Sequence, residues 1–249
     1  MIKIKTEKEI ELIRRACGIV SEIMSQLKVY IRAGISTEEL DTEAGKLLGK
    51  FGAVSAFKGY QGYPANICTS VNEEVVHGIP GKRRLKVGDI ISIDVGVKLN
   101  GYFGDAACTL PVGLISPQAR KLLAVARSAL TAGIAQAREG NHLLDISSAI
   151  QSHIESFGHS AVRKFVGHGI GSQMHEEPEI PNIGRAGLGP ALRAGMVLAI
   201  EPMVNEGNFE VEILEDKWTA VTKDRKLSAH FEHTICVTKG EPEVLTAWE

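Results

Sequence analysis

The sequence has 249 residues, of which 44% are hydrophobic and 23% are charged, and its formal net charge is −2. These values are typical of an ordinary globular protein, and they exclude a global positive field for nucleic acid or for an anionic membrane surface. No run approaches the ~18 apolar residues of a membrane-spanning helix, and no apolar signal segment follows the first residues, so a cytoplasmic protein is expected. The four cysteines form no C-x-x-C pair and are expected to be reduced, buried thiols: Cys17, Cys68, Cys108 and Cys236.

Two amphipathic helices are predicted at the start of the chain. The first follows a capping box of Thr6 and Glu9, and apolar residues then recur at three- and four-residue spacing. The second follows the same arrangement at Ser36 and Glu39 and ends near Gly52. Two helices therefore precede the first β-rich stretch.

Strands are predicted over 90–97 and 102–111, joined by Asn100-Gly101, a dipeptide typical of tight hairpins. In the second half, Ser116-Pro117 opens a helix to about residue 138, and Asp145 opens another that ends at 157–158. Further strands are predicted over the following stretches: 196–204, 208–214 and 231–238. No linker separates the halves, so we expect one compact α+β domain, 1–249, with the helices on one face of a curved antiparallel sheet.

The chain contains an internal repeat. Residues 85–94 match residues 192–201 position by position, with a spacing of 107 residues, and both segments end in an acid, Asp94 and Glu201. This period is too long for a solenoid. It predicts two duplicated αβ halves, about 1–112 and 113–249, related by a pseudo-two-fold axis that brings equivalent strand ends together.

Four carboxylates are expected at that junction. Asp94 and Asp105 stand on the two arms of the hairpin, and Glu201 and Glu232 are their counterparts in the second half. Clustered acids raise one another's pKa values unless cations neutralise them, so two divalent ions are predicted. The alternative interpretation, in which each acid is a solvated strand-end residue, does not account for the register of the repeat.

Three histidines lie in loops punctuated by glycine or proline. His168 stands between Gly167 and Gly169, which leave its ring reachable, and we interpret it as the imidazole ligand of the ions. His77 and His175 are candidates for hydrogen bonding to a developing oxyanion. The remaining histidines are interpreted as exposed polar residues: His142, His153, His159, His230 and His233.

These residues stand in motifs that closely resemble the type I methionine aminopeptidases of the short bacterial kind, in the M24 metallopeptidase family. The matching segments cover essentially the whole chain: 57–64, 70–80, 88–96, 167–171, 175–176, 200–203, 218–222 and 231–234. The resemblance implies the pita-bread fold of creatinases and aminopeptidases. It also implies an enzyme that removes the initiator methionine from nascent proteins and peptides and prefers a small second residue.

The resemblance further implies a role for each site residue. Five residues hold two divalent ions (Co, Mn, Fe or Zn), with a water or hydroxide between them that attacks the first peptide carbonyl: Asp94, Asp105, His168, Glu201 and Glu232. Asp105 and Glu232 bridge both ions, Glu201 is also a proton shuttle, and His77 and His175 bind the substrate backbone and stabilise the tetrahedral intermediate. The methionine pocket is implied to be lined by Phe57, Tyr60, Tyr63, Cys68, Met174 and Trp218.

Two positions depart from the family pattern, Phe57 and Lys217, and both bear on the expected pocket shape. The expected partner is a peptide or nascent chain that begins with Met. No nucleic acid or membrane partner is expected, a monomer is predicted, and a transient ribosome association stays open. Two rival interpretations remain: an Xaa-Pro aminopeptidase or prolidase of the same fold, and a non-catalytic peptide-binding module.

Overall fold

The computed structural model describes residues 2–248. Its helices are α1 (Glu7–Tyr30), α2 (Thr37–Lys50), the 3-10 helix η1 (Tyr60–Gly62), α3 (Pro117–Ile134) and α4 (Leu143–Ser156). The strands of the first half are β1 (Val54–Ser55), β2 (Cys68–Val71), β3 (Glu74–Val76), β4 (Ile90–Leu99) and β5 (Tyr102–Pro111). Those of the second half are β6 (Ser160–Ala161), β7 (Gly167–Gly169), β8 (Glu176–Ile180), β9 (Val197–Ile200), β10 (Met203–Asn205), β11 (Val211–Ile213), β12 (Ala220–Thr222), β13 (Ser228–His230), β14 (His233–Cys236) and β15 (Glu243–Val244).

The predicted capping residues begin three of the four long helices. Thr6 and Ser36 accept backbone N–H bonds from the third helical residue while the glutamates there bond back, and the Ser116 side chain caps α3. The prediction that Asp145 opens a helix was wrong by two residues. The helix α4 begins at Leu143, and Asp145 accepts the backbone N–H of His142 at 2.7 Å from inside the first turn.

Three predicted strands are shorter or broken. The stretch 196–204 divides into β9 and β10 at Glu201-Pro202, where proline has no N–H for the ladder. Of 208–214 only 211–213 is strand, and of 231–238 only 233–236 is strand. The helix expected to reach residue 138 ends at Ile134. The hairpin at Asn100-Gly101 is confirmed, with both residues at positive φ.

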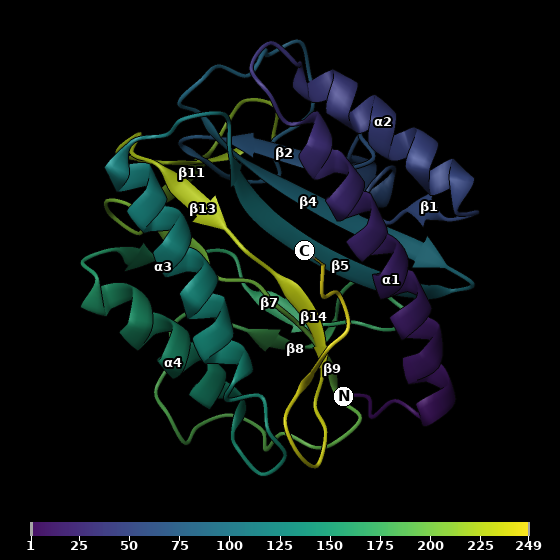
Figure 1. Cartoon of the computed structure of the whole chain (residues 1–249). Coiled ribbons are helices and arrows are strands. Elements are labelled where there is room, and N and C mark those ends of the chain that lie inside the picture. Colours follow the sequence, from purple (N-terminus) through teal and green to yellow (C-terminus); the bar gives the residue numbers. More distant parts are fainter. Residues whose placement is uncertain (1, 249) are drawn as a thin grey trace.

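The helices cover one side of the strands (Figure 1). In the first half, β4 pairs with β5 along its whole length and with β1 and β2 on its other edge, and α1 packs on β4 and β5. The second half holds the five-stranded sheet β15-β14-β9-β7-β8 and the smaller sheet β13-β10-β6, against which α3 and α4 pack. The remaining sheet is β11-β12-β3.

The core lies between the helices and the sheets. Fully buried aliphatic side chains from both layers include Ile23, Leu27, Ile91, Leu122 and Ile146. Burial of each of these side chains stabilises the folded state by about 1.5–3 kcal/mol. This burial holds the helices against one side of the strands, and the other side is open to polar residues. The four cysteines are buried and free, as predicted.

The repeat is visible in equivalent backbone contacts. The Gly34 N–H donates to the Leu85 carbonyl at 2.8 Å, and the Gly140 N–H donates to the Leu192 carbonyl at 3.0 Å. The two halves meet where β5 lies beside β14. There the Thr234 hydroxyl accepts the Asp105 N–H and donates to the Asp105 carbonyl, and the Glu232 N–H donates to the Ala107 carbonyl. This junction brings the acids of both halves together.

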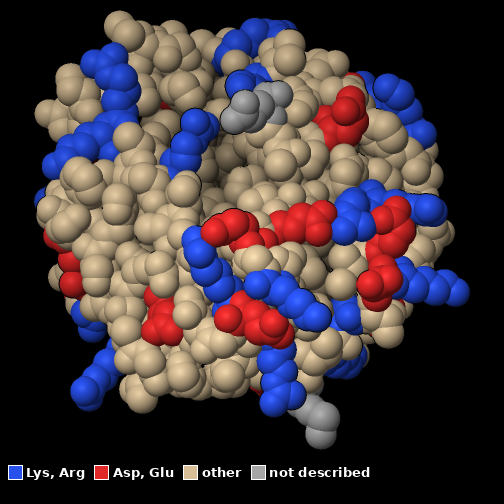
Figure 2. Space-filling model, turned by 60° about the horizontal axis from the view of Figure 1, so that its bottom comes forward, with Lys and Arg blue, Asp and Glu red and all other residues tan. Residues whose placement is uncertain are grey.

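Charged residues of both signs lie side by side over the lower half of the face in Figure 2. The described residues also form exposed ion pairs, such as those of Arg14 with Glu11 and Glu243. Within residues 2–248, every helix is too short or too polar to cross a lipid bilayer.

Candidate active site

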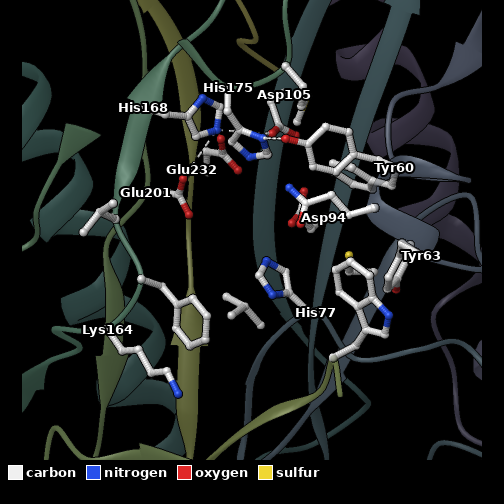
Figure 3. A pocket seen from close by; sticks show the side chains of 18 residues that line it. Tyr60, Tyr63, His77, Asp94, Asp105, Lys164, His168, His175, Glu201 and Glu232 are labelled. Carbon is white, nitrogen blue, oxygen red and sulfur yellow. Dashed lines mark hydrogen bonds and ion pairs between the residues drawn. The ribbon is translucent and has the colours of Figure 1, made fainter. Parts of the chain in front are cut away.

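Four acids converge on the face of the strands opposite the core. In the β4–β5 ladder Asp94 pairs with Ala107 and Asp105 pairs with Gly96, so the two carboxylates are diagonal neighbours on one face. Glu201 directly follows β9, and Glu232 directly precedes β14, which pairs with β9. Figure 3 shows all four side chains pointing into one cavity.

His168 joins this group from β7. Its Nδ1 lies 2.9 Å from the Gly169 carbonyl, to which it donates, and the lone pair of Nε2 therefore faces the acids. Nε2 lies 3.9 Å from Asp105 Oδ2 and 3.7 Å from Glu201 Oε1. Burial lowers the pKa of His168 to about 3, so the ring is neutral and able to bind a metal ion.

The acids are too buried and too close together to be charged on their own. Burial raises the pKa of Asp94 to about 7. It raises the pKa values of Asp105, Glu201 and Glu232 well above the usual range, and the neighbouring carboxylates add to the rise for Asp105 and Glu232. Only cations or protons can compensate such a cluster.

The donor set fits divalent cations. One ligand atom each of Asp105, His168 and Glu232 lie within 4.8 Å of one another, and all three residues are buried. Three carboxylate oxygens are buried without a hydrogen-bond partner in the described part of the chain: Asp94 Oδ1, Asp105 Oδ1 and Glu232 Oε1. A set of carboxylates and one imidazole suits Mn, Fe, Co or Zn, because these ions accept both oxygen and nitrogen ligands.

A cavity of about 310 Å³ adjoins the acids. Every residue predicted for the site lines it: Phe57, Tyr60, Tyr63, Cys68, His77, Asp94, Asp105, His168, Met174, His175, Glu201, Trp218 and Glu232. Aromatic edges form much of the wall, with Tyr63 edge-on to Phe57 and to Trp218. The cavity therefore has an acidic end and an apolar end (Figure 3).

His77 and His175 both line this cavity. The Nδ1 atom of His175 lies 2.8 Å from the Tyr60 hydroxyl, and its ring centre is 4.4 Å from that of His168. His77 has a φ of +61°, which is strained for a residue with a Cβ, and its ring packs edge-on against Phe165. Burial lowers the pKa values of both histidines, that of His77 to about 4, so both are neutral near pH 7.

The interpretation of the other five histidines as exposed was wrong. His142, His153, His159 and His233 are half-buried. His230 is buried, with 2% of its surface exposed, and its Nε2 lies 3.6 Å from Glu201 Oε2. For His230 the burial comes from contacts with Thr109, which is far away in the sequence and is not reported by any local pattern.

Sequence reasoning also missed part of the cavity wall. Three further residues line the cavity: Val76, Phe165 and Val166. In the sequence, the position of Val76 next to His77 is a signal that could have found it. Of the two departures, Phe57 lines the cavity, whereas Lys217 is an exposed turn residue that does not. The prediction that Lys217 bears on the pocket shape is therefore not supported by its position.

Comparisons with known proteins agree on one family. The model of metallopeptidase family M24 matches residues 11–239. The chain is 52% identical over 246 residues to the methionine aminopeptidase of Clostridium perfringens and to methionine aminopeptidase 1 of Bacillus subtilis, covering 99% of each chain in both cases.

Solved structures give the same result. The methionine aminopeptidase of Thermotoga maritima superposes with a TM-score of 0.98 at 45% identity, with both chains fully covered. The prolidase of Pyrococcus horikoshii shares the fold alone, with a TM-score of 0.80 at 24% identity, and the match covers 99% of this chain and 64% of that one. The predicted α+β pita-bread fold is confirmed.

Proposed function

The chain belongs to metallopeptidase family M24 and is an enzyme of the methionine aminopeptidase kind, and from this premise we propose that it removes the initiator methionine from newly made proteins and peptides. Its substrates would be chains that begin with Met followed by a small residue. The proposed place of action is the cytoplasm, with one catalytic unit formed by both halves of the chain.

Two divalent ions are proposed as the cofactors. The residues that would hold them are Asp94, Asp105, His168, Glu201 and Glu232. The buried oxygens without partners and the raised pKa values of these acids support the assignment. Such ions, when bound, lower the pKa of a water molecule and polarise a carbonyl group. Their identity in the cell depends on availability as well as on ligand type.

The apolar end of the cavity is proposed to bind the methionine side chain. Phe57, Tyr63 and Trp218 offer ring edges, and Cys68 and Met174 offer polarisable sulfur, which suits a thioether. Tyr60 lies at the rim of the cavity, and 37% of its surface is exposed to solvent. A side chain seated here places its own amino group and first peptide bond toward the acids.

Neutral histidines are proposed to act on that peptide bond. His175 is held by Tyr60 beside His168, so its Nε2 is directed toward the acidic end, where it can donate to the oxygen of the scissile carbonyl as negative charge develops. His77 is proposed to bind the substrate backbone. Glu201, half-buried directly after β9 with 14% of its side chain exposed, would accept a proton from the attacking water and pass it to the leaving amine.

The observation that carries this proposal is that a buried acid cluster without compensating charge and a set of apolar side chains line one cavity of about 310 Å³. The test is release of free methionine from Met-Ala-Ser, followed by mass spectrometry, with metal-loaded and chelator-treated protein and with an Xaa-Pro peptide as the comparison. Metal-dependent cleavage of Met-Ala-Ser alone is expected. Cleavage of the Xaa-Pro peptide alone would instead indicate a proline peptidase, and cleavage of neither by metal-loaded protein would indicate a binding module.

A further inference from the structure

Glu201 lies between two imidazoles, only one of which belongs to the proposed ligand set. Its Oε1 is 3.7 Å from His168 Nε2, and its Oε2 is 3.6 Å from His230 Nε2. The two oxygens of one carboxylate are thus divided between a histidine at the acid cluster and a histidine outside it.

The position of His230 is fixed by its backbone. It is the last residue of β13 and pairs with Met203 of β10. Its N–H donates to the Thr109 hydroxyl at 2.8 Å, and that hydroxyl donates to the His230 carbonyl at 3.0 Å. These bonds hold the backbone of His230 in place, so the ring extends from a fixed Cα beside Glu201.

The ring nitrogen that faces Glu201 has no other partner. Within residues 2–248, His230 Nε2 is buried and makes no hydrogen bond, and its distance to Oε2 is a few tenths of an ångström beyond hydrogen-bond range. An unsatisfied buried donor costs about 1–3 kcal/mol. A small rotation of the Glu201 carboxylate, which would satisfy this donor, therefore has a favourable free energy.

We propose that His230 is a positioning residue for Glu201. Its Nε2–H donates to Oε2 and holds the carboxylate so that Oε1 stays directed toward His168, where the proposed ion binds. The inference deepens the proposed function and rests on it. Residues that hydrogen-bond to a metal ligand fix the orientation of that ligand. Mutation of such a residue typically weakens metal affinity or activity by about 10–100-fold.

The test measures Mn²⁺ binding to metal-free protein by isothermal titration calorimetry, in wild type, His230→Leu and His230→Gln. Leucine approximates the volume of the ring but has no donor, so we expect the affinity of the tighter site to fall about 10–100-fold. Glutamine carries an amide N–H of similar reach, so we expect it to restore the affinity to within about threefold of wild type. Far-UV circular dichroism of each metal-free variant confirms folding.

A matched control is His153→Gln, which alters a half-buried histidine that bonds Ser128 on the helix side of the molecule. It should leave Mn²⁺ affinity unchanged. If His230→Leu fails to fold, His230→Asn replaces it, because the shorter amide cannot reach Glu201 and the same loss is expected.

Two results would overturn the inference. One is a His230→Leu affinity within threefold of wild type. The other is a His230→Gln affinity as low as that of His230→Leu, which would assign the effect to ring shape. Both leave the proposed function intact as long as wild type binds Mn²⁺ and cleaves Met-Ala-Ser. A wild type that binds no metal would instead contradict the proposed function itself.

Discussion

The ion pair between Lys5 and Glu176 ties the N-terminal segment to the strand that follows His175, and its removal should destabilise the protein. Lys5 Nζ lies 2.9 Å from Glu176 Oε2, and the side chains are only 4% and 3% exposed. Lys5→Met keeps most of the side-chain volume but leaves the Glu176 carboxylate buried without its main partner. Breaking one partner of a buried pair costs about 3–5 kcal/mol.

The lower end of that range applies here. In the variant Glu176 would keep the Gln173 N–H at 3.1 Å and the Ser172 hydroxyl at 3.3 Å, and the exposed Lys3 Nζ is 3.7 Å away. A loss of about 3 kcal/mol corresponds to a fall in Tm of about 6–12 °C for a chain of this size. Differential scanning calorimetry of metal-free protein at pH 7 and one scan rate measures this fall.

The pH dependence follows from Glu176. Burial raises its pKa, but the hydrogen bond and charge of Lys5 together lower the pKa below its usual value. The folded state therefore binds this proton more weakly than the unfolded state. The stabilisation is fully present above the unfolded pKa of about 4.3 and is lost as the pH falls through the lower folded pKa. The Tm difference between wild type and Lys5→Met should shrink below about pH 4.

A double variant and a control at an exposed lysine test this reasoning further. Lys5→Met with Glu176→Gln removes both charges and should recover most of the lost stability. Lys8→Met, at an exposed position of α1, should change Tm by less than about 2 °C. A Lys5→Met Tm within 2 °C of wild type, or a double variant no more stable than Lys5→Met, would refute the reasoning.

Three other predictions concern the site and its frame. Gly169→Ala should abolish soluble folded protein, because the new Cβ would lie 2.2 Å from the Glu177 carbonyl oxygen. The control is Gly49→Ala in α2, where the new Cβ meets nothing within 4 Å, and it should raise the free energy of unfolding in urea by about 0.5–1 kcal/mol. Metal-free protein should lose stability as the pH rises from about 4 to 7, because the unfolded state releases its carboxylic protons near pH 4 whereas burial keeps the proton on Asp94 up to about pH 7 and holds those of Asp105 and Glu232 as well. Saturating Mn²⁺ should abolish this slope, and a flat metal-free profile would argue against it. Tyr60→Phe, which removes the hydroxyl bonded to His175, should lower kcat/KM on Met-Ala-Ser about 3–10-fold, and an unchanged value would exclude a role for that bond.

The convergence of the acids was predictable because its signal is repeated. The segments that end at Asp94 and Glu201 share glycines and apolar residues in one register. Their apolar runs are typical of buried strands, so the shared register predicts that the two acids stand at equivalent strand ends. The hairpin at Asn100-Gly101 was predictable for a local reason, since two positive φ values suit those residues. The capping boxes at Thr6 and Ser36 carried the same kind of local information.

His230 was not predictable, because its burial depends on contacts far away in sequence. Thr109, which holds its backbone, is 121 residues distant, and β10 covers it from another part of the chain. The start of α4 was misplaced for a different reason. An aspartate in the first turn resembles a cap in sequence, but here Asp145 is the inner member of the pair and His142 is the outer one.

The central claim is that two metal ions, held by a shared set of acids, are required for methionine release. The most direct measurement is the Mn²⁺ stoichiometry of wild type and Asp105→Asn by calorimetry, with Met-Ala-Ser cleavage measured on the same samples. The account predicts two ions per chain in wild type, loss of at least one ion in Asp105→Asn, and a fall in kcat/KM of at least about 100-fold, comparable to the loss of a main electrostatic contribution to catalysis. An Asp105→Asn protein that keeps both ions and full activity would contradict it.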